Sequence, residues 1–206
     1  MTRRHLVCST RSMTMDTRVI AVCGSLRDDS RTRTALELAL AAAEAAGAET
    51  ELVDLRAYDL PPYGRVTPVG RAGDVPALRE TVDAADGILL GTPIYHGSYA
   101  SPLKTALDYC KREHLRGSTV GLLATAGGRF PTKGLEHLRN VCRHLNAWVV
   151  PTEVAIPNAS EVIVDGEVVD PSYEDRVREL GRDVTRYAHV ECLPELLDRT
   201  ATSACD

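Results

Sequence analysis

Short apolar runs alternate along the chain with segments whose apolar residues recur at helical spacing. Five runs have the length of buried strands, and they occupy residues 18–23, 50–55, 87–92, 119–125 and 147–156. Helical spacing is found at residues 31–46, 76–84, 101–115 and 132–145, and again after residue 171. Near-continuous apolar strands that alternate with helices are typical of a parallel sheet covered on both faces. The pattern therefore predicts an α/β domain with a doubly wound, five-stranded parallel sheet.

Single residues predict where some of these elements begin or turn. Ser101 is placed to cap the helix that follows it, and Ser172 with Asp175 resembles a capping box before the last helix. The pair Asp165-Gly166 lies within an alternating apolar and polar run, which is a strong signal for a β-hairpin. We therefore expect a small β-insertion between the fifth strand and the last helix.

The length of 206 residues suits one domain with a substantial core. We expect this domain to span residues 15–190. Residues 1–14 are basic but lack the apolar core of a signal peptide, so they are predicted to be a disordered extension, with Met13 and Met15 as alternative starts. Residues 191–206 are predicted to be a C-terminal tail.

Composition argues against several classes of protein. The formal net charge of -5 does not suit a nucleic-acid binder, which usually needs a clustered positive surface. No apolar run approaches the ~20 residues that a membrane span requires, so no membrane association is expected. The cysteines show neither a C-x-x-C pair nor a metal-type spacing, which predicts buried free thiols, no metal site and a reducing, cytoplasmic location. They are Cys8, Cys23, Cys110, Cys142, Cys192 and Cys205.

Three strand exits are rich in Gly, Ser, Thr and Pro, and they locate the candidate site. We call them the first loop (24–32), the second loop (92–101) and the third loop (125–131). In doubly wound sheets, ligands bind beyond the carboxyl ends of the strands, where the strand order changes direction. The three loops are therefore predicted to meet around one ligand.

The first loop, "GSLRDDSRT", has the chemistry of a phosphate site. Ser25, Ser30 and Thr32 offer hydroxyl donors beside the N-terminus of a helix, and the guanidinium of Arg27 matches the geometry of a phosphate. The loop matches neither G-x-G-x-x-G nor the P-loop pattern. The alternative is structural: the two serines cap the helix, and Arg27 and Arg31 are solvated.

Taken together, "GSLRDDSRT" and "TPIYHGSYASPLKTALDY" resemble the NADPH-dependent FMN reductase family of flavodoxin-like proteins. The third loop, "TAGGRF", is also similar to that family, and the resemblance covers roughly residues 17–155. It implies a flavodoxin-like sheet with strand order 2-1-3-4-5. It also implies FMN as the cofactor and NADPH or NADH as co-substrate.

The resemblance implies a set of cofactor-binding residues. Four residues would hold the FMN phosphate: Ser25, Arg27, Ser30 and Thr32. Six would line the isoalloxazine ring and the ribityl chain: Pro93, Ile94, Tyr95, His96, Gly97 and Ser98. Four would approach the other edge of the ring: Thr125, Ala126, Gly127 and Gly128. The family often has Asn, Glu and Asn at positions 32, 94 and 96, so backbone contacts rather than side-chain contacts are implied at 94 and 96.

The implied reaction is hydride transfer from a nicotinamide to flavin N5, followed by reduction of a small acceptor such as free flavin, a quinone or an azo compound. The cofactor carries this chemistry, so no catalytic side chain is assigned. Two alternatives remain at this point: a flavodoxin-like electron carrier, and a flavin-free binding module. Arg27 and the mild net charge favour the reductase.

Two further expectations come from the resemblance. Family members often use a lysine and an aspartate of one helix across a subunit interface, and Lys104 and Asp108 occupy such positions. A homodimer or homotetramer through the helix at about 102–116 is therefore implied. Relatives with iron–sulfur centres carry a cysteine cluster after the second strand, whereas residues 56–75 form a Gly-, Pro- and Arg-rich segment without cysteine. No iron–sulfur centre is expected.

Overall fold

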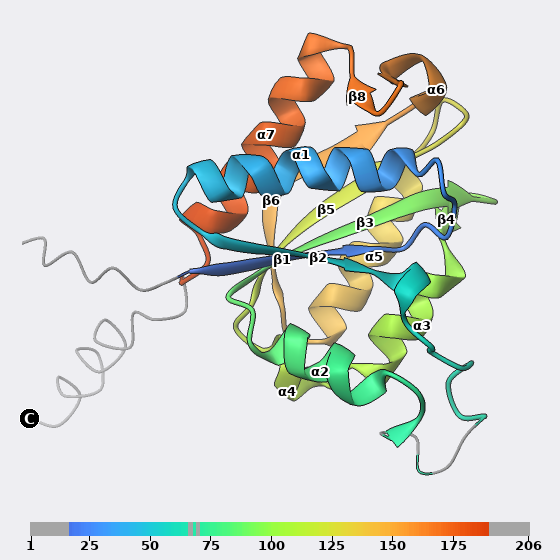
Figure 1. Cartoon of the computed structure of the whole chain (residues 1–206), viewed down its shortest axis with the longest axis vertical. Coiled ribbons are helices and arrows are strands. Elements are labelled where there is room, and N and C mark those ends of the chain that lie inside the picture. The colour runs from blue at the N-terminus through green and yellow to red at the C-terminus, as the bar shows by residue number, and fades with distance from the viewer. Residues whose placement is uncertain (1–16, 66–67, 69–70, 190–206) are drawn as a thin grey trace, which may run out of the picture.

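A central sheet with helices on both faces forms most of the molecule (Figure 1). The computed structural model describes residues 17–65, 68 and 71–189. The predicted N-terminal extension (1–14) and C-terminal tail (191–206) lie outside the described residues, as do Cys8, Cys192 and Cys205.

The sheet has five parallel strands in the order β2-β1-β3-β5-β6. Their bounds are Arg18–Cys23 for β1, Glu49–Asp54 for β2, Gly87–Tyr95 for β3, Thr119–Thr125 for β5 and Trp148–Ile156 for β6. The predicted order of the five parallel strands is confirmed. The sheet differs in detail because a two-residue strand, β4 (Ser98–Tyr99), pairs antiparallel with the end of β3.

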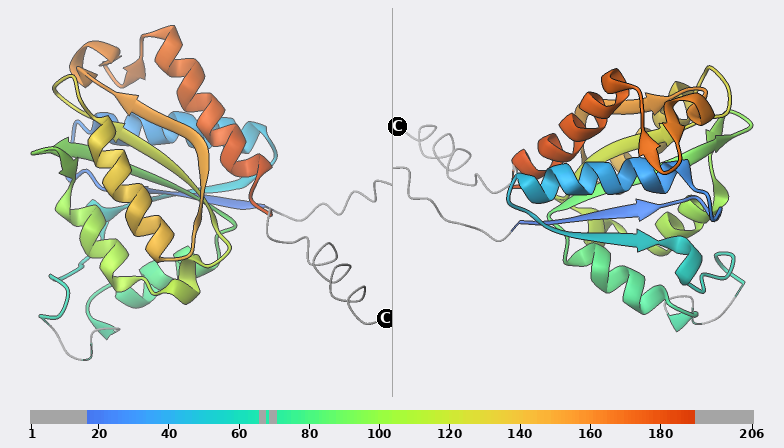
Figure 2. Two further views of the ribbon diagram at one scale, coloured as in Figure 1. Left: turned by 180° about the vertical axis from the view of Figure 1, so that it is seen from behind. Right: turned by 45° about the horizontal axis from the view of Figure 1, so that its top comes forward.

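Alternate residues of the central strands pack into two separate cores. Val19 and Ala21 of β1 pack against the helices α1 and α7, whereas Ile20 and Val22 face the layer of α2 to α5. Figure 2 shows these two helical layers in two further orientations. Because both faces are covered, the central strands are apolar at nearly every position. The helices are α1 (Arg31–Ala45), α2 (Val75–Asp83), α3 (Ser101–Tyr109), α4 (Arg112–Leu115), α5 (Thr132–His144) and α7 (Pro171–Arg186).

Two predictions about helix ends are wrong. Ser101 is the first residue of α3, and Ala100 precedes it without a side-chain cap. The last helix is capped by Asp170, whose carboxylate accepts a hydrogen bond from the amide of Ser172 at 2.9 Å. The helix predicted over 101–115 is broken, because Cys110 is extended and separates α3 from α4.

The β-hairpin predicted around Asp165 and Gly166 is confirmed. Strands β7 (Ile163–Val164) and β8 (Glu167–Val168) pair antiparallel, and the two turn residues have φ of 49° and 81°. A short helix, α6 (Ala159–Val162), precedes the hairpin and had no sequence signal. The Gly-, Pro- and Arg-rich segment at 56–75 begins within a 3-10 turn, η1 (Leu55–Ala57).

Candidate functional site

A cavity of about 430 Å³ lies at the carboxyl ends of the parallel strands. It is lined by Ser25, Arg27, Asp29, Ser30, Arg31, Thr32, Pro93, Ile94, Tyr95, Thr125, Ala126, Gly127, Gly128, Ala159 and Ser160. Residues from all three loops therefore meet around one space. Of the residues named from sequence, His96, Gly97 and Ser98 are not part of this lining.

Close backbone packing sets the start of the first loop. The amide of Gly24 donates to the carbonyl of Gly91 at 2.8 Å, and a Cβ at Gly24 would lie 2.7 Å from the Cβ of Leu103. Only glycine allows β1 to pass this close to α3. The chain then turns across the end of the sheet and enters α1 at Arg31.

The three hydroxyls of the first loop are buried beside the N-terminus of α1. The hydroxyl of Ser30 caps this helix by accepting from the amide of Arg33 at 3.1 Å. Ser25 and Thr32 are each 2% exposed. The capping interpretation therefore holds for Ser30, yet the same residue lines the cavity. The first-turn amides of a helix have no intrahelical acceptor, so this end of α1 favours an anion.

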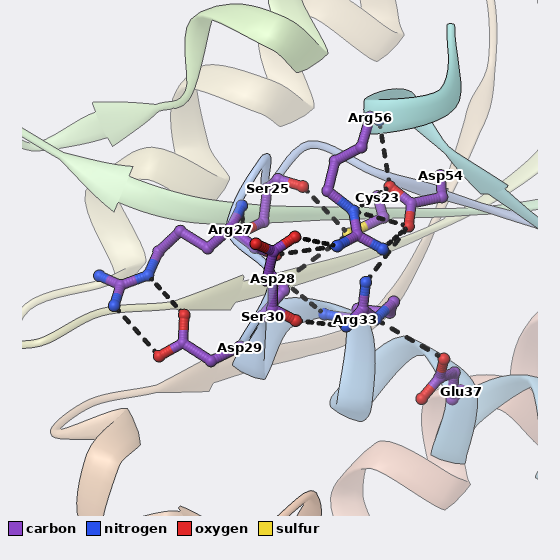
Figure 3. Close-up of polar contacts among 10 residues, drawn as sticks. All are labelled: Cys23, Ser25, Arg27, Asp28, Asp29, Ser30, Arg33, Glu37, Asp54 and Arg56. Atoms are coloured by element: carbon purple, nitrogen blue, oxygen red, sulfur yellow. Dashed lines mark hydrogen bonds and ion pairs between the residues drawn. The ribbon is translucent and has the colours of Figure 1, made fainter.

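Arg27 is held by a carboxylate at the mouth of the cavity (Figure 3). Its Nε and Nη2 donate to the two carboxylate oxygens of Asp29 at 3.0 and 3.1 Å. Both side chains are well exposed, at 62% and 66%. Hydrogen bonds from Arg27, and then its charge, lower the pKa of Asp29. The guanidinium fork thus already binds an anion in this structure. No motif in the sequence singles out Asp29 for this contact.

The second loop is a β-hairpin rather than an irregular loop. Strand β3 continues to Tyr95, turns at His96 and Gly97, and returns as β4. The turn residues have φ of 50° and 78°, the left-handed values of a type I′ turn. This geometry carries the turn beyond the cavity, while Ile94 and Tyr95 stay in its lining.

The third loop is joined to the first by a hydroxyl pair. The Oγ1 atoms of Thr125 and Thr32 lie 2.7 Å apart, and Thr125 is 4% exposed. Farther along, the amide of Ala159 donates to the carbonyl of Ala126 at 2.9 Å. The amide of Asn158 donates to the carbonyl of Gly128 at 3.1 Å. These bonds explain why α6 lines the cavity.

The lining suits anion binding and hydrogen bonding. Its ionisable side chains are Arg27, Asp29, Arg31 and Tyr95. The Nε of Arg31 donates to the carbonyl of Ile163 at 3.3 Å, so the hairpin after α6 orients this second arginine. Within the described ranges, no group of three or more His, Cys, Asp or Glu side chains could hold a metal ion.

The described cysteines are buried free thiols, as predicted. They are Cys23, Cys110 and Cys142. Burial raises the pKa of Cys110 and of Cys142 to about 12. Burial also raises the pKa of Cys23, which lies under the first loop. A raised pKa keeps the thiol protonated, whereas the thiolate is the reactive form. These side chains therefore behave as small apolar groups.

Comparison with protein families decides the assignment. The model of the NADPH-dependent FMN reductase family matches residues 17–161, more than half of the chain. The chain belongs to this family. The match includes all three loops and ends within α6, so the hairpin and α7 follow the matched segment.

A curated relative agrees with the family assignment. An FMN-dependent NADPH-azoreductase of Staphylococcus aureus is 44% identical over 78 residues, which are 38% of this chain and 42% of that protein. The chain thus matches about two-fifths of the length of this curated relative.

Solved structures resemble the whole sheet with its helices. The flavoenzyme FerB from Paracoccus denitrificans has a TM-score of 0.72 at 22% identity, covering 84% of this chain and 97% of that chain. A Corynebacterium diphtheriae oxidoreductase has a TM-score of 0.66 at 24% identity, covering 85% and 98%. An archaeal flavodoxin has a TM-score of 0.58 at 12% identity, covering 84% and 99%. The predicted flavodoxin-like fold is confirmed.

No helix in the described part of the chain is both long enough and apolar enough to cross a membrane.

Proposed function

We propose that the cavity binds FMN and that the protein is an FMN-dependent NAD(P)H oxidoreductase. The observation that carries this proposal is that residues of two different chemistries line one cavity. Buried hydroxyls, arginines and a helix N-terminus form the first set, which we call the charged end, and glycines with half-buried apolar side chains form the second set, which we call the neutral end. FMN has the same division between a charged phosphate and a flat ring.

The residues at the charged end fit a phosphate monoester. Ser25 and Thr32 bring buried hydroxyls to the cavity, and α1 directs its first-turn amides there. Arg27 supplies a fork that already binds a carboxylate and that could bind phosphate oxygens in the same way. Thr32, where the family often has Asn, retains a donor.

The residues at the neutral end fit a flat polar ring. A Cβ at Gly127 or Gly128 would meet nothing within 4 Å, so this part of the lining is open backbone. Pro93 and Ile94 add apolar surface to the same lining. The cavity volume lies in the range usual for sites of small molecules and cofactors.

Bound FMN would supply the hydride and electron chemistry. The chain's own residues would orient the cofactor, exclude water from one side of the ring and donate hydrogen bonds to negative charge on it. The S. aureus relative is named for FMN, NADPH and azo compounds, which supports a nicotinamide donor and a small acceptor. Free flavin, a quinone or an azo compound would suit the acceptor role.

A spectrum of the purified protein tests this proposal. We expect flavin absorbance at about 450 nm, either as isolated or after addition of FMN. Steady-state oxidation of NADPH and of NADH then separates an oxidoreductase from an electron carrier of the flavodoxin type. A protein that stays colourless and leaves FMN fluorescence unchanged would contradict the proposal. Flavin binding without nicotinamide oxidation would favour the carrier.

We also propose that α3 carries a homodimer or homotetramer interface. Lys104 and Asp108 form an ion pair on α3, beside a cavity of about 530 Å³ between α3, α4 and α5. Charge reversal in Lys104→Glu should lower the mass measured by analytical ultracentrifugation. Glu44→Lys, at the end of α1 on the other face of the sheet, is the matched control. A wild-type monomer would contradict this proposal.

A further inference from the structure

Two arginines outside the cavity share one carboxylate behind the first loop (Figure 3). Asp54 ends β2, Arg33 lies in the first turn of α1, and Arg56 lies in η1. The Oδ2 of Asp54 accepts from Nη2 of Arg56 at 2.5 Å and from Nη1 of Arg33 at 3.3 Å. Burial raises the pKa of Asp54, and the charge of Arg33 opposes this rise. One carboxylate thus ties η1 to α1.

Both arginines also bind the backbone of the first loop. Nη2 of Arg33 donates to the carbonyl of Asp28 at 2.6 Å. Nη1 of Arg56 donates to the carbonyl of Arg27 at 3.4 Å and to the Asp28 carboxylate at 3.1 Å. Two successive carbonyls of the loop are therefore directed toward the same cluster.

The direction of these carbonyls determines the direction of the next two amides. In a trans peptide unit, the N–H points opposite to the C=O. The amide of Asp28 shares its peptide unit with the carbonyl of Arg27, and the amide of Asp29 shares its unit with the carbonyl of Asp28. Both N–H groups therefore point away from Arg33 and Arg56. The side chains of Arg27 and Asp29, which line the cavity, leave the loop on that side, as Figure 3 shows.

The side chains of this cluster are less exposed than Arg27, which forms the ion pair at the cavity mouth. The side chains of Arg33, Asp54 and Arg56 are 22%, 19% and 29% exposed, against 62% for Arg27. Exposed pairs contribute little to a fixed geometry, whereas partly buried charged networks are screened less by salt. Neither Arg33 nor Arg56 lines the cavity, so any influence on a ligand passes through the loop.

We propose that Arg33 and Arg56 are positioning residues that hold the first loop with its amides toward the cavity before a phosphate monoester binds. The inference rests on the proposed FMN function and deepens it. A loop ordered in advance does not have to be ordered on binding, so this cluster would set part of the affinity for the phosphate group.

The test uses the full chain with four substitutions. Arg56→Ala and Arg33→Ala each remove one support of the loop. Arg56→Lys keeps the charge but loses the fork that reaches Asp54 and the loop together. Arg178→Ala is the matched control, because it removes a partly exposed arginine that is paired with Glu174 along α7, on another element from the first loop.

Two measurements are made on each variant. Hydrogen exchange of the ligand-free protein reports how well the amides of residues 26–30 are held. Fluorescence titration gives the dissociation constants for FMN and for riboflavin, which lacks the phosphate, at low and at high salt. Circular dichroism confirms that each variant is folded.

For both alanine variants we expect faster hydrogen exchange of the loop amides. We also expect the dissociation constant for FMN to rise on the order of tenfold. Arg56→Lys should fall between wild type and Arg56→Ala, and the loss should persist at high salt, since long-range charge effects are screened there. Riboflavin binding should change much less, and Arg178→Ala should match wild type in both measurements.

Three results would overturn the inference. Unchanged loop exchange would show that the arginines do not hold the loop. Faster exchange with unchanged FMN binding would show that ordering of the loop by the arginines has no role in binding the phosphate. A loss of affinity that vanishes at high salt, or that Arg56→Lys fully restores, would assign a role to charge alone. If the wild type binds neither FMN nor riboflavin, the proposed function fails first, and any exchange difference then reports only a structural cluster.

Discussion

The first and third loops reach the same cavity but are held in place by different chemistry. Charged side chains hold the first loop, with Arg33 and Arg56 behind it and Arg27 paired to Asp29 in front. The third loop is held by backbone amides of the segment after β6, which donate to the carbonyls of Ala126 and Gly128. One loop is rich in charge, and the other presents mostly backbone.

This difference matches the two ends of the proposed ligand. A dianionic phosphate is bound best by permanent charge and a helix N-terminus, and such binding depends on salt. A flat, nearly neutral ring needs close backbone approach and hydrogen-bond donors, which depend little on salt. The comparison therefore predicts that substitutions in the first loop act on FMN more than on riboflavin, and that substitutions in the third loop act on both.

Arg27→Ala should have the largest effect on binding. We expect FMN affinity to fall about 10- to 100-fold, because a charge-assisted bidentate contact is lost. Riboflavin affinity should hardly change. Fluorescence titration with both flavins measures the difference. An unchanged FMN dissociation constant would remove Arg27 from the phosphate site and leave Arg31 as the lining arginine to be tested next.

Removing the hydroxyl bond between the two loops should lower stability. Thr125→Val leaves the hydroxyl of Thr32 buried without its partner, which should lower the free energy of unfolding by about 1–3 kcal/mol. The double variant Thr32→Val with Thr125→Val should regain part of this loss, since no lone hydroxyl remains. Urea unfolding of the wild type, of each single variant and of the double variant measures these changes. Simple additivity of the two single losses would contradict the assigned contact.

Asp29→Asn should tighten FMN binding by on the order of a few-fold, because it frees Arg27 and removes a negative charge near the phosphate. Arg27 lowers the pKa of Asp29, so the carboxylate stays charged at neutral pH. The ion pair is present above that lowered pKa and is lost as the pH falls through it. Titration at neutral pH and low salt should show the gain, and added salt should reduce it. Equal affinity at low salt would contradict competition between carboxylate and phosphate.

The sequence predicts the sheet and the place of the site because both depend on local patterns. Buried parallel strands are apolar at nearly every position, and small polar residues collect where those strands end. The shape of the second loop could not be predicted in the same way. Its turn uses His96-Gly97 rather than the Asn-Gly pair that marks most type I′ turns, and Tyr95 and Ser98 flank it without a clear strand pattern.

Contacts between distant segments had no sequence signal. Asp54 and Arg33 are separated by 21 positions and meet only because β1 and β2 lie side by side. Ala159 and Ser160 line the cavity through the path of the chain after β6, and no motif in the sequence around them indicates this role. Such residues become visible only when the strand order and the loop conformations are known.

Gly128→Ala should have the smallest effect on stability. A Cβ there would meet nothing within 4 Å, and the φ of Gly128 is not in the left-handed region, so the free energy of unfolding should change by less than about 0.5 kcal/mol. Gly24→Ala is the matched contrast in the first loop, because its Cβ would lie 2.7 Å from that of Leu103 and should cost about 1–3 kcal/mol. Binding should respond differently from binding in the first-loop variants: the new methyl group at position 128 belongs to the cavity lining and should weaken the binding of FMN and of riboflavin alike. A loss confined to FMN would place the phosphate at the third loop and reverse the comparison.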